Sequence, residues 1–199
     1  MTLYCATGNP GKLREFRSAA RAPWRIEPLP ELARISAPEE TGATFDENAI
    51  QKARHYAQFA NRVPLFAEDS GLEVDALGGA PGVYSARFAG PDADDASNNE
   101  LLLKRLQDAA GRRARYVAVI ALILPGDPPR TFRGTVEGEI LREPRGSGGF
   151  GYDPLFFYPP FGATFAEVSA GQKLTVSHRG RAVEKMMDFL HGPGTGADT

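Results

Sequence analysis

The chain is predicted to adopt an α/β fold, in which helices pack on a central β-sheet. Apolar segments of strand length alternate with segments of helical spacing through the first two thirds of the sequence, as this class requires. Residues 116–124 are almost continuously apolar and β-branched, which is typical of a central strand buried on both faces. The chain has 199 residues, 42% of them hydrophobic, so it can bury a sizeable core.

The first half of the chain has clear element boundaries. A short apolar strand at residues 3–7 leads into a Gly-Asn-Pro-Gly turn, and a helix is expected over residues 12–20. Thr44 and Glu47 are spaced as a capping box, so a second helix is expected over residues 45–61. Further strands are expected at residues 24–28, 65–67 and 72–76, the last because its apolar positions alternate.

The second half continues the alternation. A helix is expected over residues 98–110, and residues 130–141 are expected to form one or two strands after a Pro-rich turn. Apolar residues at helical spacing predict a last helix over residues 178–190. Residues 192–199 are Gly, Pro, Thr, Ala and Asp, so we expect one domain over residues 1–191 and a flexible tail.

The overall composition excludes several classes of function. The net charge is −2, which gives no support for nucleic acid as a partner, although a small anion needs only local positive charge. Cys5 is the one cysteine, so there is no intrachain disulfide and no thiolate metal cluster, and we expect a buried thiol in the first strand. There is no signal-peptide pattern and no apolar run of about 18 residues. We therefore expect a soluble cytoplasmic protein with no membrane partner.

The loop between the first expected strand and helix has the composition of an anion site. It consists of Thr7, Gly8, Asn9, Pro10, Gly11 and Lys12. Backbone N–H groups at a helix start attract anions, and a lysine adds positive charge. The loop is not a Walker A motif, because Ala6 and Leu13 stand where that motif has Gly and Ser or Thr. A tight strand-to-helix turn explains the same residues equally well, so both interpretations stay open.

Lys52 falls within the apolar side of the expected second helix, seven residues after Phe45. A lone buried ammonium is costly, so such a lysine either pairs with an anion or extends its amine to water. Nearby carboxylates or phosphates would favour pairing. On the pairing hypothesis, Lys52→Met lowers the affinity for a phosphate ligand, while thermal stability holds or rises.

Two acidic pairs, Glu39-Glu40 and Glu68-Asp69, offer oxygen ligands to a metal ion. Asp69 follows an expected strand, where α/β folds present functional groups. Magnesium prefers oxygen ligands, often one or two carboxylates together with substrate phosphates. The alternative is that these residues are solvated loop acids and a turn-forming Asp-Ser-Gly, and we favour that alternative for Glu40.

A glycine-rich loop, Gly149-Phe150-Gly151-Tyr152-Asp153-Pro154, suits a flat heterocycle with polar edges. Its glycines let the backbone approach a ligand closely, its two aromatic rings offer flat faces, and its aspartate offers acceptor oxygens. Ser177-His178-Arg179 follows as a second polar cluster. Lys173 and Arg179 are surface residues by default, and only their place after this loop makes them candidates.

Six segments, in this order, resemble the inosine/xanthosine triphosphate pyrophosphatase family. They are Ala6-Thr7-Gly8-Asn9 through Lys12, Phe45 through Ala53, Asp69-Ser70-Gly71-Leu72, Gly78 through Arg87, Gly149 through Pro154, and Ser177-His178-Arg179-Gly180. Each segment alone is unspecific, but six in order are highly specific. The resemblance implies an elongated mixed central β-sheet flanked by helices, with two lobes and an active-site cleft between them. It also implies a homodimer, dependence on Mg²⁺, and hydrolysis of ITP, dITP and XTP to the monophosphate and pyrophosphate.

The resemblance also implies a role for each matching position. Asp69 would be the base that activates water, and Glu39 and Asp69 would bind Mg²⁺. Ser70 would contact the substrate. The phosphates would be held by Thr7, Gly8, Asn9, Pro10, Gly11, Lys12 and Lys52. The base and sugar would be held by Phe150, Gly151, Tyr152, Asp153, Lys173, His178 and Arg179.

Selectivity follows from the edge of the base. Hypoxanthine and xanthine present a carbonyl oxygen beside an N–H, and adenine reverses that pattern. We take Arg179 as the donor, Asp153 as the acceptor and Phe150 as the residue stacked on the ring. We then expect the specificity constants for ITP and XTP to be well above that for GTP, and the constant for ATP to be the lowest. Ribose and deoxyribose forms should be handled alike.

Two departures and two other functions remain open. Glu68 replaces the aspartate common before the catalytic one, and Gln172 and Leu174 make the segment around the family's lysine less polar and acidic. The same residues could serve a pyrophosphatase for other modified nucleotides, or a nucleotide sensor without turnover. The loop from Phe150 to Asp153, with His178 and Arg179, argues against the first function. The presence of Asp69, Glu39 and Lys52 together argues against the second.

Overall fold

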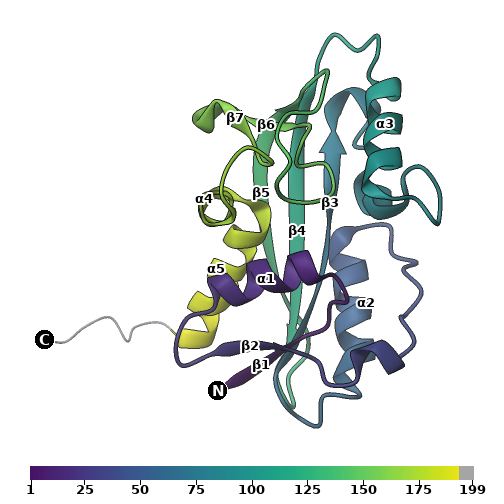
Figure 1. Ribbon diagram of the computed structural model, residues 1–199. Helices are drawn as coiled ribbons and strands as arrows, with labels where there is room; N and C mark the ends of the chain where they lie inside the picture. The colour runs from purple at the N-terminus through teal and green to yellow at the C-terminus, as the bar shows by residue number, and fades with distance from the viewer. Residues whose placement is uncertain (193–199) are drawn as a thin grey trace, which may run out of the picture. The chain divides into compact units, whose positions relative to one another are not determined.

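The computed structural model (Figure 1) describes residues 1–192. The chain divides into two compact units. Unit 1 comprises residues 1–69, 119–134 and those from 179 onward, and unit 2 comprises residues 70–118 and 135–178. The chain passes between the units at four places, including the Asp69–Ser70 and His178–Arg179 peptide bonds. The predicted tail, apart from Gly192, lies outside the described residues.

Unit 1 is built on parallel strands. Strand β1 (Thr2–Cys5) pairs in parallel with β2 (Arg25–Pro28) and with the start of β3 (Leu65–Val74). Helix α1 (Pro10–Ala19) packs against β2. Its Phe16 ring meets the Phe66 ring edge-on at a centroid distance of 5.0 Å. Helices α2 (Phe45–Ala57) and α5 (His178–His191), the latter beyond its first residue, complete the helices of this unit.

Unit 2 has its own apolar core. It contains α3 (Asp95–Arg105), α4 (Ala170–Val176) and the strands β6 (Phe156–Tyr158) and β7 (Ala163–Thr164). It also holds the larger part of β4 (Arg113–Ile123) and part of β5 (Arg130–Ile140). The buried side chains of this core include Leu72, Leu102, Tyr116, Tyr152, Phe156 and Phe165.

The strands form one mixed sheet in the order β2-β1-β3-β4-β5-β6-β7. The β1 pairings are parallel, whereas β5 with β6 and β6 with β7 are antiparallel. Short 3₁₀ helices lie at Leu32–Arg34, Asp75–Leu77, Gly82–Arg87 and Pro159–Phe161. The predicted mixed sheet flanked by helices is therefore confirmed, while a cleft between two lobes stays a prediction. No helix within residues 1–192 is long and apolar enough to cross a membrane.

The capping signals account for where the main helices begin. The Thr44 hydroxyl accepts from the Glu47 N–H at 3.2 Å, and the Glu47 carboxylate accepts from the Thr44 N–H at 3.2 Å, which confirms the predicted capping box. The same device starts α4 between Ser169 and Gln172, a helix that the sequence analysis missed. The spacing of these two residues was the signal that could have predicted it.

The prediction of two strands around a turn at Glu68-Asp69-Ser70-Gly71 is wrong. Strand β3 runs without interruption from Leu65 to Val74, so Asp69 lies inside a strand and not at its end. The polar run resembles a turn in sequence, but Glu68 and Asp69 are buried. Their charges are matched by cations from distant segments, so a polar run can continue inside the sheet. Residues 130–140 form one strand, β5, which settles the choice between one and two.

Candidate active site

The predicted phosphate loop is a capped entry into α1. Asn9 is the N-cap, and its Oδ1 accepts from the N–H groups of Gly11 at 2.8 Å and Lys12 at 3.1 Å. The Thr7 hydroxyl in turn accepts from the Asn9 N–H at 3.2 Å. Asn9 therefore already occupies two of the N–H groups that an anion would use. Gly8, Asn9 and Pro10 are exposed, Thr7 and Lys12 are half-buried, and Gly11 is buried.

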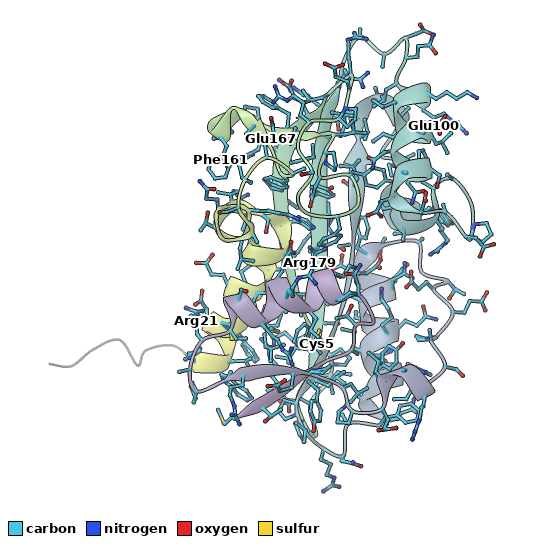
Figure 2. The ribbon with its side chains drawn as sticks, viewed as in Figure 1. Cys5, Arg21, Glu100, Phe161, Glu167 and Arg179 are labelled. Carbon is cyan, nitrogen blue, oxygen red and sulfur yellow. The ribbon has the colours of Figure 1, made fainter. Side chains whose placement is uncertain are left out.

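A chain of ion pairs links α1, β3 and the start of α5 within unit 1. Arg179, which takes part in it, is labelled in Figure 2. Lys12 Nζ lies 2.7 Å from one oxygen of Glu68, and Arg179 Nε donates to the other at 3.0 Å. The Arg179 guanidinium also pairs with Glu15. The Glu68 and Arg179 side chains are only 1% and 3% exposed, so the default expectation of Arg179 at the surface is wrong. Burial opposes the charge of Arg179, but Glu68 and Glu15 outweigh it and raise the pKa of the guanidinium.

Lys52 lies half-buried between two carboxylates. Its Nζ is 2.7 Å from Asp69 Oδ1 and 3.2 Å from Glu40 Oε1, and its side chain is 13% exposed. Burial disfavours the ammonium, but Asp69 and Glu40 outweigh that effect and raise the pKa of Lys52. The pairing hypothesis for Lys52 is therefore confirmed over extension into water. The expectation that Glu40 is only a solvated acid is wrong, whereas Glu39 is the exposed residue of the two.

Asp69 is held on both of its oxygens. Oδ1 accepts from Lys52, and Oδ2 accepts from the Asn48 amide at 3.3 Å. Burial raises the pKa of Asp69, and this effect exceeds the opposing attraction of Lys52. Asn48 was missed from the sequence, although its position three residues after Phe45 places it on the apolar side of α2. It is fully buried there, so its polar groups need partners. Gly42 fits closely against it, since an added Cβ would lie 2.6 Å from Asn48 Oδ1.

In unit 2, the loop at residues 149–154 folds around Asp153. Asp153 Oδ2 accepts from Lys173 Nζ at 2.6 Å and from the Phe150 N–H at 2.9 Å. Asp153 and Lys173 are 1% and 4% exposed, so the default expectation of Lys173 at the surface is also wrong. The Lys173 ammonium lies 4.7 Å from the centroid of the Phe150 ring, within cation–π range. A Cβ on Gly149, whose φ is +73°, would lie 2.0 Å from Asp153 Oδ2, so only glycine fits there.

Tyr152 and His178 anchor this cluster in the unit 2 core. The Tyr152 hydroxyl donates to the Ser85 carbonyl at 2.8 Å, and its side chain is buried. The expectation that the Tyr152 ring offers a face to a ligand is therefore wrong. Burial, with a smaller effect from Asp95, raises the pKa of Tyr152. The His178 ring stacks on Tyr116 at a centroid distance of 4.6 Å and an angle of 12°.

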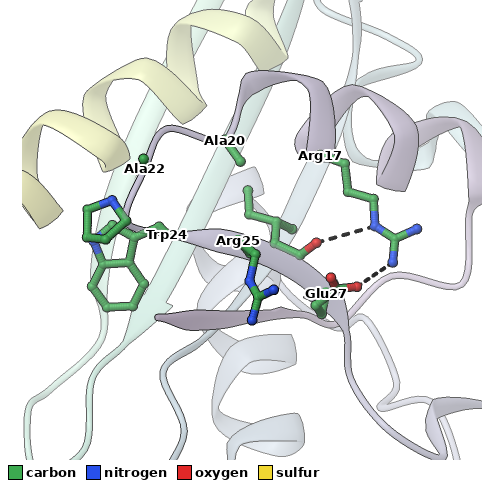
Figure 3. A pocket seen from close by; sticks show the side chains of 8 residues that line it. Arg17, Ala20, Ala22, Trp24, Arg25 and Glu27 are labelled. Carbon is green, nitrogen blue, oxygen red and sulfur yellow. Dashed lines mark hydrogen bonds and ion pairs between the residues drawn. The ribbon is translucent and has the colours of Figure 1, made fainter.

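Two predicted residues, Ser70 and Gly151, are half-buried, and two pockets of the protein lie away from the predicted site residues. Ser70 is half-buried in β3 as the first residue of unit 2, and Gly151 is half-buried with φ of +64°. A pocket of about 510 Å³ (Figure 3) and another of about 550 Å³ contain none of the predicted site residues. The first is lined by Arg17, Ala20, Ala22, Pro23, Trp24, Arg25, Ile26 and Glu27. The second is lined by Glu100, Leu103, Lys104, Gln107, Arg112 and Arg142.

Comparison with known proteins decides the family. The model of the Ham1 family matches residues 3–189. This chain belongs to the Ham1 family. A protein named dITP/XTP pyrophosphatase from Syntrophobacter fumaroxidans is 50% identical over 197 residues, which cover 95% of this chain and 84% of that protein. A protein of the same name from Thermus thermophilus is 48% identical, covering 97% of this chain and 94% of its own.

Solved Ham1 structures agree with the fold. The Staphylococcus aureus Ham1 protein matches with a TM-score of 0.86 and 41% identity, over 96% of this chain and 99% of that one. A HAM1 protein from Coxiella burnetii matches with a TM-score of 0.87 and 41% identity, over 97% and 100%. The resemblance read from six sequence segments is thereby confirmed as Ham1 membership.

The acidic residues of this Ham1 chain can be tested for a divalent cation. No group of three or more His, Cys, Asp or Glu side chains arranged as metal ligands occurs in residues 1–192. Asp69 and Glu40 nevertheless converge on one cation, the Lys52 ammonium. Magnesium commonly takes one or two protein carboxylates and completes its shell with phosphate oxygens and water. Asp69 and Glu40 therefore fit a shared Mg²⁺ ligand pair better than the exposed Glu39 does.

Proposed function

We propose that this Ham1 chain hydrolyses the deaminated purine triphosphates ITP, dITP and XTP to the monophosphate and pyrophosphate. The observation that carries the proposal is a buried carboxylate, Asp69, held by Lys52 and Asn48 in a cluster rich in cations. The names of relatives that are 46–50% identical over almost the whole chain support the same activity. The protein is in this view a nucleotide-pool cleansing enzyme, with Mg²⁺ as cofactor.

Asp69 is proposed as the general base. Its task is to orient a water molecule towards the α-phosphorus and to accept the proton that the water loses. A base works best when its pKa lies near the operating pH, and burial moves the pKa of Asp69 upward in that direction. Lys52 keeps the carboxylate charged, and Asn48 fixes its second oxygen. No side chain is required as a covalent nucleophile.

The cations of unit 1 are proposed to hold the triphosphate. Lys12 and Lys52 present two ammonium groups, and residues 7–11 supply the turn at the start of α1, which is exposed from Gly8 to Pro10. Both lysines now bind carboxylates, so phosphate would compete with those ion pairs. Asp69 with Glu40, or with Glu39, would hold Mg²⁺, and the bound ion would supply charge neutralisation for the leaving pyrophosphate.

The polar loop of unit 2 is proposed to hold the purine base. Phe150 would stack on the ring, and Asp153 with Lys173 would form the buried charged pair at its edge. The Tyr152 side chain is committed to the core, so only its backbone is available to a ligand. Arg179 remains the proposed donor to the base carbonyl, and its pairs with Glu68 and Glu15 would orient it. His178 and Ser70 complete the proposed substrate contacts.

A panel of nucleotides tests this proposal. Pyrophosphate release is measured with ITP, dITP, XTP, GTP and ATP, with Mg²⁺ and with excess EDTA. We expect kcat/KM to be highest for ITP, dITP and XTP, lower for GTP and lowest for ATP. Activity should be lost in excess EDTA. Comparable kcat/KM for ATP and ITP would contradict the base assignment, and binding without turnover would identify a sensor. Light scattering tests the proposed homodimer, and cell fractionation tests the proposed cytoplasmic location.

Asp69→Asn tests the role of the base. The variant keeps the shape of the side chain, so it should fold and lose about 10²–10⁴-fold in kcat. Asp108→Asn is the matched control, because Asp108 is exposed, and it should keep full activity. A folded Asp69→Asn protein with normal turnover would remove Asp69 from the mechanism.

A further inference from the structure

Two side chains of α3 hold the peptide groups on either side of Gly151. Asp95 Oδ2 accepts from the Gly151 N–H at 2.6 Å. Asn99 Nδ2 donates to the Gly151 carbonyl at 2.9 Å and to the Asp95 carbonyl at 2.7 Å. Asp95 and Asn99 are four residues apart, so they lie on the same side of the helix. All three residues belong to unit 2.

These two bonds fix the backbone of the loop from outside. Gly151 has φ of +64°, a left-handed conformation that glycine adopts readily, and glycine restricts its own backbone least of all residues. The bond to Asp95 fixes the peptide before Gly151, and the bond to Asn99 fixes the peptide after it. The amide oxygen of Asn99 is buried and accepts no hydrogen bond from the described residues. Asn99 therefore contributes through the two bonds that its amide nitrogen donates.

The helix that carries the two side chains is itself firmly anchored. Asp94 and Ser97 form a capping box at its start. Asn98, the neighbour of Asn99, accepts from the Ala89 N–H at 2.9 Å and donates to the Ala86 carbonyl at 3.2 Å. The helix also buries Leu102 completely in the unit 2 core. The bonds from α3 therefore attach the loop at residues 149–154 to a well-anchored helix of unit 2.

We propose that Asp95 and Asn99 are positioning residues that set the purine selectivity of this enzyme. This inference rests on the proposed function. Gly151 adjoins Phe150, the proposed stacking surface, and lies two residues before Asp153, the proposed reader of the base edge. Neither α3 side chain needs to touch the substrate. A displacement of about 1 Å in a catalytic arrangement costs up to about 10²-fold in rate, so the loop must be held to that tolerance.

The kinetic test compares neighbouring asparagines. Asn99→Ala should lower kcat/KM for ITP by about 10–100-fold, because the loop no longer holds the base in the required position. It should also reduce the ratio of kcat/KM for ITP to kcat/KM for GTP, called here the ITP to GTP ratio. Asn98→Ala is the matched control, since Asn98 also makes two backbone bonds but none to the loop. It should lower the melting temperature and leave the ITP to GTP ratio at the wild-type value. Asp95→Ala should behave as Asn99→Ala does, and Asp95→Asn, which keeps an acceptor oxygen, should restore the ratio.

Hydrogen exchange tests the two bonds from Asp95 and Asn99 to Gly151, here called the clamp, without any measurement of activity. The Gly151 amide should lose at least about tenfold of its protection in Asp95→Ala, because a bond to a charged acceptor is removed, and regain it in Asp95→Asn. An unchanged Gly151 exchange rate would overturn the clamp. Faster exchange with an unchanged ITP to GTP ratio would overturn its role in selectivity. Inactivity of the wild-type protein on every triphosphate would instead defeat the proposed function, and the exchange data would still report on the clamp.

Discussion

Replacement of Lys52 by methionine removes the ammonium that Asp69 and Glu40 share. The sequence alone suggested that this variant would keep or gain stability, since a lone buried charge is costly. The structure reverses that expectation, because two carboxylates with 8% and 29% exposed side chains would lose their cation. Breaking a buried ion pair costs about 3–5 kcal/mol. The partial exposure of Lys52 and Glu40 places the expected loss at the lower end, about 3 kcal/mol.

For a chain of this length, about 1 kcal/mol shifts the melting temperature by about 2–4 °C. Lys52→Met should therefore melt about 6–12 °C below the wild-type protein in a thermal scan at neutral pH. Lys104→Met is the matched control, because Lys104 is exposed on α3, and it should change stability by less than about 0.5 kcal/mol.

A second substitution separates lost pairing from lost packing. Asp69→Asn removes the carboxylate charge that Lys52→Met leaves uncompensated, so the double variant should recover at least about 1 kcal/mol relative to Lys52→Met. A melting temperature for Lys52→Met within about 2–4 °C of the control, about 1 kcal/mol, would refute the reasoning. So would a double variant less stable than Lys52→Met, because the charge of Asp69 would then not be the source of the cost.

Two further predictions concern a glycine and the cysteine. Gly149→Ala should lower both the melting temperature and ITP turnover, since the new Cβ would lie 2.0 Å from Asp153 Oδ2 at a φ of +73°; wild-type values for both would contradict the close fit. Burial, with Glu68 as a smaller cause, raises the pKa of Cys5 well above 9.0. The thiol of the unfolded chain then ionises at a lower pH than the thiol of the folded protein. The free energy of unfolding should therefore be constant below the pKa of the unfolded thiol and should fall as the pH rises above it. Cys5→Ala should flatten this alkaline decline, and an identical pH profile would count against the assignment.

The sequence predicted local features well. The alternation of strands and helices gave the fold class, and the capping box at Thr44 gave the start of α2 because both partners lie within four residues. The position of Lys52 on the apolar side of α2 predicted its burial. In each case the decisive physics is local: a turn of helix, or the periodicity of one face.

The long-range ion pairs could not be predicted in the same way. Arg179 and Glu68 are 111 residues apart in sequence, and no local pattern shows that they meet. Without its distant partners, the run around Asp69 reads as a turn. Tyr152 was misjudged for a related reason, because a glycine-rich loop has no periodicity to show which side chains turn into the core. The roles of the site residues stay predictions, as does the single-domain boundary at residue 191.

The ion pairs of unit 1 have a consequence for what can bind there. Three cationic side chains face four carboxylates: Lys12, Lys52 and Arg179 against Glu15, Glu40, Glu68 and Asp69. In these ion pairs the carboxylates outnumber the cations by one, so the phosphates of a bare triphosphate would meet repulsion from them. A divalent ion arriving with the nucleotide would offset two of the negative charges of the triphosphate and so weaken that repulsion. On the proposed function, we therefore expect the metal–nucleotide complex, and not the free nucleotide, to be the species that binds.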